Sequence, residues 1–358
     1  MEFGILFTSQ PHTDREPYPH RGVHQRVTDE IMAADRLGFD CAWLAEHHFS
    51  TEYGIMPDVW VYAGYLAALT KRIKLGMAVV TLPLANPVRT VENAGFVDIL
   101  SGGRVVLGVG SGYRKYEFDG FGLEFEARRD TQEEALEIVL DLLRTGRSAR
   151  NGKHFNVDIS GDYQLLPRPV QQPYPPLYLA GATDRSIATA GRHGFGLMLS
   201  TLTPFATLAR QVAHYRANLE KASNDARANP AFGRIDVARW VYVAETDAKA
   251  KRDSEEGLLR HLKHFFGGHQ VGYLGQVSQG KDSVTGGLDY DTLARSTIIH
   301  GSPTSVAARI AELKENTGLT SLMLHYPPWY GTERAQASLE LFATEVMPRI
   351  RTPAKAAE

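Results

Sequence analysis

The sequence predicts an α/β fold, a single (β/α)8 barrel of the TIM type with insertions. Short β-type runs alternate with longer helical patterns along most of the chain, which favours parallel strands joined by right-handed helical crossovers. Eight such runs can be recognised, and eight parallel strands close this kind of barrel. The length of 358 residues suits one barrel with insertions, because the plain fold takes about 250 residues.

The expected strands are short runs rich in apolar residues. They cover residues 2–7, 40–45, 73–81, 104–109, 177–180, 197–200, 236–244 and 321–325. A doubly wound open sheet is the alternative fold, but that fold favours a glycine-rich fingerprint directly after its first strand. The segment after Phe7 is TSQPHTD, which contains no glycine.

The expected helices carry apolar residues at helical spacing and have recognisable caps. In the first helix Val27, Ile31 and Ala34 share one face, and Gly38 suits its C-terminal cap. Asn86 and Pro87 suit the start of another. Further helices are expected near residues 58–69, 86–100, 125–143, 183–194, 204–222, 247–265, 302–318 and 333–346.

Two stretches interrupt the alternation. Residues 151–176 are rich in proline and contain a run, 153–159, that can form a small hairpin, so we expect an insertion there. Residues 265–290 are rich in glycine and lack helical periodicity. A loop of that length is usually functional or disordered, and we expect a lid over the barrel mouth, with a plain surface loop as the alternative. On this interpretation residues 1–358 form one domain.

Composition excludes several classes of function. The chain has 39 basic and 41 acidic residues, a formal charge of −2, so no long-range field attracts nucleic acid or an anionic membrane. Its single cysteine, Cys41, cannot form a disulfide within the chain. No apolar run approaches the roughly 20 residues that cross a bilayer, and the start does not resemble a signal peptide. We therefore expect a cytoplasmic protein with no nucleic-acid or membrane partner.

Candidate chemistry first appears at the end of the second expected strand. The segment LGFDCAWLAEHHF places Glu46, His47 and His48 just past the strand, where active-site groups of barrels collect. A histidine at this place can be a general acid or base, a metal ligand or a structural residue. A metal-dependent hydrolase would favour a His-x-His pair, which the chain lacks, so we expect no metal site.

A candidate anion site lies at residues 181–186, GATDRS, between a strand and a helix. Free N–H groups and the dipole at a helix N-terminus bind anions, and the hydroxyls of Thr183 and Ser186 add donors. Thr183 can equally act as the helix cap. In the fourth-strand loop, Gly108, Gly110 and Gly112 allow close approach of the backbone to a ligand.

Several blocks resemble the bacterial luciferase α-subunit and its flavin-dependent monooxygenase relatives. They are EHHF, ANPVRTVENAGFVDILSGGRVVLGVGSGYRKYEFDGFG, PLYLAGATDRSIATAGRHG, TGLTSLMLHY and LFATEVMP, in this order along nearly the whole chain. The resemblance implies a monooxygenase that takes reduced FMN from a separate flavin reductase. It would use O2 to oxygenate a small organic substrate through a C4a-(hydro)peroxyflavin. The resemblance also implies a homodimer formed through helices near the second and third strands.

The resemblance assigns roles to particular positions. His47 matches the histidine beside the flavin ring that acts in acid–base catalysis, and Glu46 and His48 match neighbours that orient it or support the strand end. A non-prolyl cis peptide is implied at Ala78-Val79, under the flavin ring. The remaining implied cofactor-binding residues are Gly110, Ser111, Gly112, Ala182, Thr183 and Ser186.

The sequence also departs from luciferase. Luciferase has a cysteine at Gly110, an arginine at Ser111 and a glutamate at Ala182, which puts light emission and an aldehyde substrate in doubt. Arg185 or Arg114 can replace the missing phosphate ligand.

Two alternatives on the same fold stay open. A hydride-transfer enzyme using coenzyme F420 would favour an Asp-His pair in place of Glu46-His47-His48, and a catalytically silent flavin-binding protein would not need His47 or a lid. Aromatic residues crowd the loop after the fourth strand, where Tyr113, Tyr116, Phe118 and Phe121 can line a substrate pocket or pack the loop. Trp329 and Tyr330, near the end of the last strand, have the same two interpretations.

Overall fold

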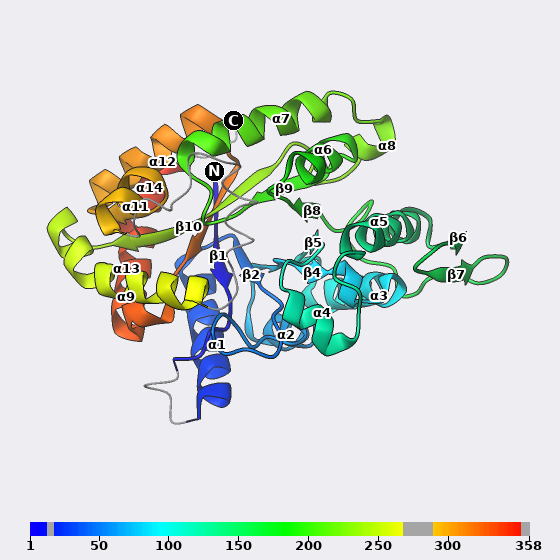
Figure 1. Cartoon of the computed structure of the whole chain (residues 1–358), viewed down its shortest axis with the longest axis horizontal. Helices are drawn as coiled ribbons and strands as arrows, with labels where there is room; N and C mark the ends of the chain where they lie inside the picture. Colours follow the sequence, from blue (N-terminus) through cyan, green and yellow to red (C-terminus); the bar gives the residue numbers. More distant parts are fainter. Residues whose placement is uncertain (13–17, 268–288, 352–358) are drawn as a thin grey trace.

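Eight parallel strands close into a barrel in the computed structural model, which describes residues 1–12, 18–267 and 289–351. The order around the barrel is β1, β2, β3, β5, β8, β9, β10 and β12, and β12 pairs with β1 to complete the ring. Helices surround the strands, and the β6–β7 hairpin projects at the right-hand edge of Figure 1. The predicted (β/α)8 fold class is confirmed.

The strands of the described chain are β1 (Glu2–Phe7), β2 (Cys41–Leu44), β3 (Lys74–Met77), β4 (Val80–Thr81), β5 (Val105–Gly110), β6 (Ser148–Asn151), β7 (Asn156–Ile159), β8 (Leu177–Ala180), β9 (Gly196–Leu199), β10 (Ile235–Val243), β11 (Ile299–Gly301) and β12 (Ser321–His325).

The helices are α1 (Pro19–Leu37), α2 (Val59–Leu69), η1 (Leu82–Leu84), α3 (Pro87–Ser101), α4 (Lys115–Phe121), α5 (Arg128–Thr145), α6 (Asp184–Arg192), α7 (Phe205–Leu219), α8 (Asn224–Arg227), α9 (Asp247–Gly267), α11 (Tyr290–Ser296), α12 (Pro303–Thr317), η2 (Pro328–Tyr330), α13 (Thr332–Leu341), η3 (Phe342–Val346) and α14 (Met347–Ile350). None of these described helices is both long and apolar enough to span a membrane.

Local structure differs from the sequence prediction at the third strand, in the loop after β5 and in the insertion. The third strand is interrupted at Ala78-Val79, where the peptide bond is cis as the resemblance implied, and continues as β4. The loop after β5 contains helix α4, which the sequence did not indicate. A hairpin is present near residues 151–176, but it starts earlier because β6 pairs with β7. The predicted lid lies mostly in 268–288, outside the described residues.

Large side chains fill the barrel interior. Trp43 of β2 points inward between Gly4 of β1 and Gly76 of β3, and a Cβ at either glycine would collide with the indole ring. Tyr178 of β8 packs edge-on against Trp43 at 5.6 Å between ring centroids. The interior is therefore a packed core, as in other barrels of this class, and a ligand can enter only from an end.

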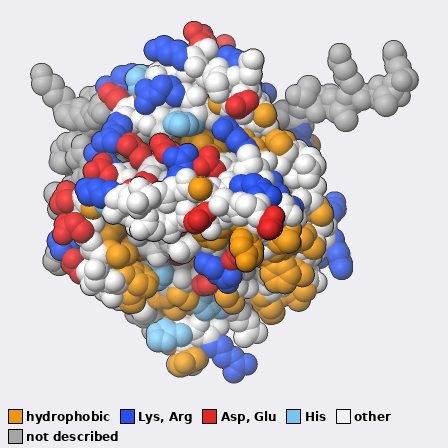
Figure 2. Space-filling model, turned by 90° about the vertical axis from the view of Figure 1, so that its right-hand side faces the viewer, with side chains coloured by type: hydrophobic (Ala, Val, Ile, Leu, Met, Phe, Trp, Pro, Cys, Tyr) orange, Lys and Arg blue, Asp and Glu red, His pale blue; other side chains and the backbone are white. Residues whose placement is uncertain are grey.

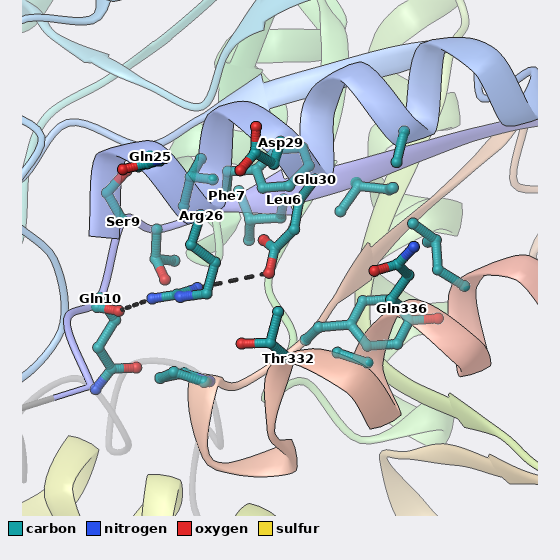
Figure 3. Close-up of a pocket in the computed structure, with 18 of the residues that line it drawn as sticks. Leu6, Phe7, Ser9, Gln10, Gln25, Arg26, Asp29, Glu30, Thr332 and Gln336 are labelled. Carbon is teal, nitrogen blue, oxygen red and sulfur yellow. Dashed lines mark hydrogen bonds and ion pairs between the residues drawn. The ribbon is translucent and has the colours of Figure 1, made fainter. Parts of the chain in front are cut away.

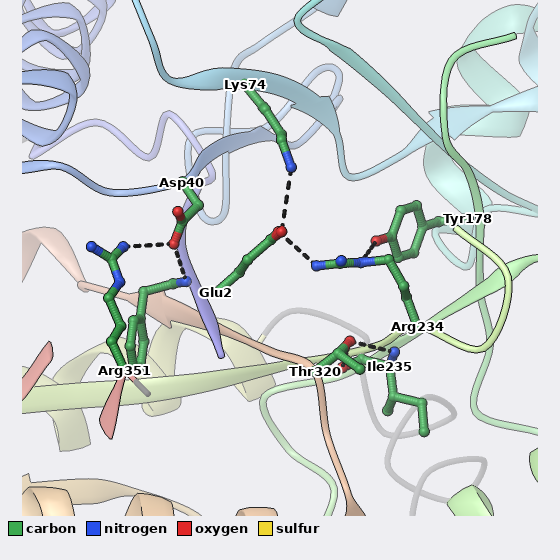
Figure 4. Close-up of polar contacts among 9 residues, drawn as sticks. Glu2, Asp40, Lys74, Tyr178, Arg234, Ile235, Thr320 and Arg351 are labelled. Carbon is green, nitrogen blue, oxygen red and sulfur yellow. Dashed lines mark hydrogen bonds and ion pairs between the residues drawn. The ribbon is translucent and has the colours of Figure 1, made fainter. Parts of the chain in front are cut away.

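Charged residues gather at the N-terminal ends of the strands. Figure 4 shows the Glu2 carboxylate between Lys74, at 3.4 Å, and Arg234, at 2.6 Å, while Arg351 contacts Asp40 at 2.8 Å. Further in, Asp236 of β10 is 1% exposed. Burial raises the pKa of the Asp236 carboxyl to about 7, an effect that Arg234 opposes only in part.

The raised pKa of Asp236 predicts how stability depends on pH. Between its unfolded pKa near 4 and about pH 7, the folded chain binds more protons than the unfolded chain, so stability falls as pH rises through this window. Asp236→Asn should raise the free energy of unfolding at pH 8 by roughly 1–4 kcal/mol, with little change at pH 4, as measured by urea unfolding. Asp162→Asn, at an exposed loop position, is the control. An equal effect of Asp236→Asn at both pH values would contradict the prediction.

Candidate active site

A cavity of about 240 Å³ lies at the C-terminal ends of the barrel strands. Its lining comes mainly from the segments that follow β2, β3, β5, β8 and β9. The nine catalytic and cofactor-binding residues that the resemblance implies all line this cavity: His47, Ala78, Val79, Gly110, Ser111, Gly112, Ala182, Thr183 and Ser186. Residues far apart in the sequence thus meet in one place because parallel strands end at the same rim.

His47 forms a buried pair with Glu117. The imidazole Nδ1 lies 3.0 Å from Glu117 Oε1, and the same carboxylate oxygen accepts a hydrogen bond of 3.0 Å from the backbone N–H of His48. Both side chains are buried, with 9% and 4% exposed. The backbone N–H of His47 donates a hydrogen bond of 2.9 Å to the Met56 carbonyl, which helps to fix the loop after β2.

Burial decides the protonation state of His47. It lowers the pKa of the imidazole to about 4, and the Glu117 carboxylate opposes this shift only in part. The ring is therefore neutral at pH 7. Since an ionised carboxylate only accepts hydrogen bonds, Nδ1 carries the proton and Nε2 keeps its lone pair. His47 can act as a general base through Nε2.

The side chains of the two neighbours of His47, Glu46 and His48, pair with each other. Glu46 Oε1 lies 3.3 Å from Nε2 of His48, and the His48 ring packs edge-on against Phe121 at 4.9 Å. Of the two roles that the resemblance implied for Glu46 and His48, orienting His47 or supporting the strand end, their side chains suit the second, since they pair with each other. Their side chains form a separate pair, whereas the orienting carboxylate, Glu117, comes from α4.

The other end of the cavity is the start of α6. Thr183 Oγ1 accepts from the N–H of Ser186 at 3.3 Å, and Ser186 Oγ accepts from the N–H of Thr183 at 3.2 Å. The two residues thus form a capping box. Thr183 is the helix cap, which was one of the two sequence interpretations, and the helix N-terminus faces the cavity that these residues line.

Of the two arginines expected to replace the missing phosphate ligand, neither is placed well for that role. Arg185 lines the cavity but binds Glu133 with two hydrogen bonds of 2.9 and 2.7 Å. Arg114 is buried against the rings of Tyr53 and Tyr113 and is not a lining residue. Arg128 of α5 lines the cavity instead.

Arg128 was missed by the sequence analysis. Its side chain is only 9% exposed, its guanidinium packs 3.8 Å from the Phe125 ring centroid, and burial lowers its pKa. The nearest carboxylate, Glu126, is 3.8 Å away and 82% exposed. A buried guanidinium whose counter-charge is exposed favours an anionic ligand. Arg129 and Gln132 of the same helix also line this end.

The glycines at the end of β5 and just after it have close protein neighbours. A Cβ at Gly108 would collide with the Met77 carbonyl, and one at Gly110 would lie 2.8 Å from Val79 Cγ2. Gly112 has φ of 72°, which favours glycine. Gly110 and Gly112 line the cavity, so the close approach of a ligand to them stays a prediction.

The aromatic residues of the same loop have different surroundings. Tyr113 lines the cavity, together with Tyr53, whose ring stands edge-on to His47 at 4.7 Å. Phe118 is buried in packing, and Phe121 is 46% exposed. Tyr116 contacts Arg114 through its hydroxyl at 3.1 Å.

A larger cavity, about 470 Å³, lies outside the barrel between α1 and α13. Figure 3 shows Arg26 there, directed at Glu30 and the Gln10 carbonyl. Of the predicted site residues, none lines it. The smaller cavity carries the histidine–carboxylate pair and the helix N-terminus, and we assign the candidate site to it. Within the described residues, no three His, Cys, Asp or Glu side chains are grouped to hold a metal.

Comparison with known proteins places these features in context. The sequence model of luciferase-like monooxygenases matches residues 1–321. Limonene 1,2-monooxygenase of Rhodococcus erythropolis is 27% identical, over 97% of this chain and 86% of that protein. An uncharacterized protein of Sinorhizobium fredii is 34% identical over 189 residues, 51% of this chain. The matched part spans 53% of that relative.

Solved structures show the same fold. The oxygenating constituent of 3,6-diketocamphane monooxygenase from Pseudomonas putida, in complex with FMN, superposes with a TM-score of 0.82 at 22% identity, covering 99% of each chain. The coenzyme F420-dependent tetrahydromethanopterin reductase of Methanopyrus kandleri has a TM-score of 0.70 at 21% identity, covering 98% of this chain and 99% of that one.

The Glu117 contact predicts the state of the His47 ring. In ¹⁵N NMR spectra, His47 should be neutral and protonated on Nδ1 from pH 6 to 8, with its titration near pH 4. Glu117→Gln should lower that pKa further and weaken the preference for Nδ1, because the charge that favours the imidazolium is gone. Asp119→Asn, at an exposed residue paired with Lys115 on the same helix, should change neither. A cationic His47 at pH 7 would contradict the assignment.

Proposed function

Because the chain belongs to the luciferase-like monooxygenase family, we propose that it is the oxygenase component of an FMN-dependent monooxygenase. The observation that carries this proposal is the cavity with a neutral His47 at one end and the α6 N-terminus with Arg128 at the other. Reduced flavin, when bound, supplies the two electrons with which O2 is activated for transfer of one oxygen atom to an organic substrate. A separate flavin reductase would provide the reduced FMN, and the P. putida relative is likewise described as an oxygenating constituent.

The residues of the cavity suit the parts of FMN. The α6 N-terminus, the hydroxyls of Thr183 and Ser186 and the guanidinium of Arg128 suit a phosphate. The apolar lining at Ala78 and Val79 suits a flavin ring. His47 would stand beside that ring, where the Nε2 lone pair takes a proton during the reaction and Glu117 keeps the imidazole in one tautomer.

We place the protein in the cytoplasm. Cys41, the single cysteine of the chain, is a buried free thiol, which suits a reducing compartment.

Exposed apolar side chains support a homodimer. Val61 and Tyr65 of α2, and Phe96, Ile99 and Leu100 of α3, are between 41% and 72% exposed, and the two helices pack together. Figure 2 shows hydrophobic side chains gathered on the lower half of the face that it displays. Exposed apolar patches of this kind mark interfaces. We therefore propose that α2 and α3 pack against a second copy of the chain.

The reaction with oxygen tests the proposed function. Photoreduced FMN bound to the protein should give, when O2 is admitted, a long-lived absorbing species that is neither oxidised nor reduced FMN. His47→Ala should leave the FMN dissociation constant unchanged and change the lifetime or formation rate of this species about a hundredfold or more. Immediate return to oxidised FMN in the wild type would contradict a monooxygenase.

Binding controls separate the alternatives. FMN should bind more tightly than riboflavin, which lacks the phosphate. Arg128→Gln should reduce the ratio of the two affinities about tenfold. Arg144→Gln, at an exposed position on the same helix, should not. Coenzyme F420 binding in place of FMN would instead support hydride transfer.

Sedimentation analysis tests the dimer. The wild-type chain should sediment as a dimer at micromolar concentration, and Phe96→Glu should shift it to monomer because a charge cannot be buried unpaired at the interface. Tyr163→Glu alters a side chain that is 78% exposed away from α2 and α3 and should not change the mass. A monomeric wild type would overturn the proposal.

A further inference from the structure

The histidine and the carboxylate of the candidate site come from two separate segments. His47 lies in the loop after β2, and Glu117 lies on α4, 70 residues further along the chain. Their 3.0 Å contact joins two side chains with rotatable bonds. Such a contact keeps its geometry only if the surrounding residues also hold the two backbones at a fixed separation. The site therefore depends on further links between this loop and α4.

The side chain of Arg114 provides such a link. Arg114 directly precedes α4 and is 4% exposed. Its backbone carbonyl accepts a hydrogen bond of 3.1 Å from the N–H of Glu117. Its guanidinium lies 4.4 Å from the ring centroid of Tyr53, which belongs to the loop that carries His47. Arg114 thus joins the start of the helix that holds Glu117 to the loop that holds His47.

Three tyrosines surround this guanidinium, and we call Tyr53, Tyr113 and Tyr116 the tyrosine cage. The ring centroids of Tyr113 and Tyr116 lie 5.1 and 5.9 Å from the guanidinium carbon. The guanidinium also donates hydrogen bonds of 3.4 and 3.1 Å to their hydroxyl oxygens. Aromatic rings attract a cation over their faces, and more strongly where water is excluded. A planar guanidinium suits such stacking better than an ammonium group does.

Two rings of the tyrosine cage flank the imidazole of His47. The rings of Tyr53 and Tyr113 stand edge-on to it, with centroids at 4.7 and 6.1 Å, and both residues line the cavity. Of the two cavities described above, neither includes Arg114 in its lining. Arg114 therefore acts on the site through the tyrosine rings and through its charge, without touching a ligand.

Several groups around His47 influence its charge. Burial lowers the pKa of the imidazole, the hydrogen bond to Glu117 raises it, and the positive charge of Arg114 and the neighbouring His48 lower it again. Tyr113 is uncharged at pH 7, because burial raises its pKa. The result is a His47 pKa of about 4. The charge of Arg114 thus acts together with burial, and against Glu117, to keep the ring neutral.

We propose that Arg114 is a positioning residue of the oxygenase, which holds the tyrosine cage against His47 and presents a fixed positive charge to the imidazole. The inference rests on the proposed function, because a general base has a task only if the chain is an enzyme. It adds a residue outside the cavity lining to the parts that keep His47 ready to accept a proton.

Titration of the ligand-free protein tests the role of the charge. In ¹H–¹⁵N NMR spectra, Arg114→Met should raise the pKa of His47 from about 4 by roughly one pH unit, because a like charge is lost. Arg114→Gln, which is also uncharged, should give the same change. Lys115→Gln removes an equal charge from the next residue, which is exposed and paired with Asp119, and should leave the pKa of His47 unchanged.

The same spectra test the role of the cage. Arg114→Lys keeps the positive charge but loses the planar group that stacks on the rings. It should leave the His47 pKa at about 4 and change the chemical shifts of the His47 ring protons, because the flanking rings of Tyr53 and Tyr113 move. Arg114→Met should change both quantities, and Lys115→Gln should change neither.

Each outcome decides between positioning and a merely structural role. An unchanged His47 pKa in folded Arg114→Met and Arg114→Gln would overturn the proposal, even with a lower melting temperature. Unchanged ring-proton shifts in Arg114→Lys would overturn it as well. Failure of both uncharged variants to fold, with Lys115→Gln folded, would mark Arg114 as structural. Because these readouts use ligand-free protein, a wild type that does not bind FMN would remove the proposed function and leave the test of Arg114 intact.

Discussion

Trp43 occupies the barrel interior between β1 and β3, where Gly4 and Gly76 leave no side chain in its way. Trp43 and Tyr178, which packs against it, fill the centre of the barrel, so they block passage from one end to the other. The N-terminal end is closed by the charged residues around Glu2. The candidate site therefore lies at the C-terminal rim, where loops from different strands meet and where His47 lies.

At that rim, low solvent access sets the chemistry. A histidine in water is half protonated near pH 6.5, but burial keeps His47 neutral and the Glu117 carboxylate fixes its proton on Nδ1. The same low solvent access that keeps His47 unprotonated favours an anion beside Arg128, whose charge is faced within 4 Å only by the exposed Glu126. The cavity thus presents a base at one end and an anion-binding group at the other.

The sequence by itself determined the barrel, because hydrophobic periodicity and caps are local signals, and it pointed to the strand end at Glu46–His48 and to the helix start near Thr183. The resemblance to luciferase relatives singled out His47 and implied the cis peptide at Ala78-Val79, which the structure contains. It did not indicate Glu117, which lies 70 residues from His47 on a short helix with no clear periodic pattern. Arg128 was likewise hidden, since an arginine in a helix looks the same in sequence whether it faces solvent or a cavity. Only the tertiary structure decided these roles, because closing the barrel brings strand ends together and determines which side chains lose contact with water.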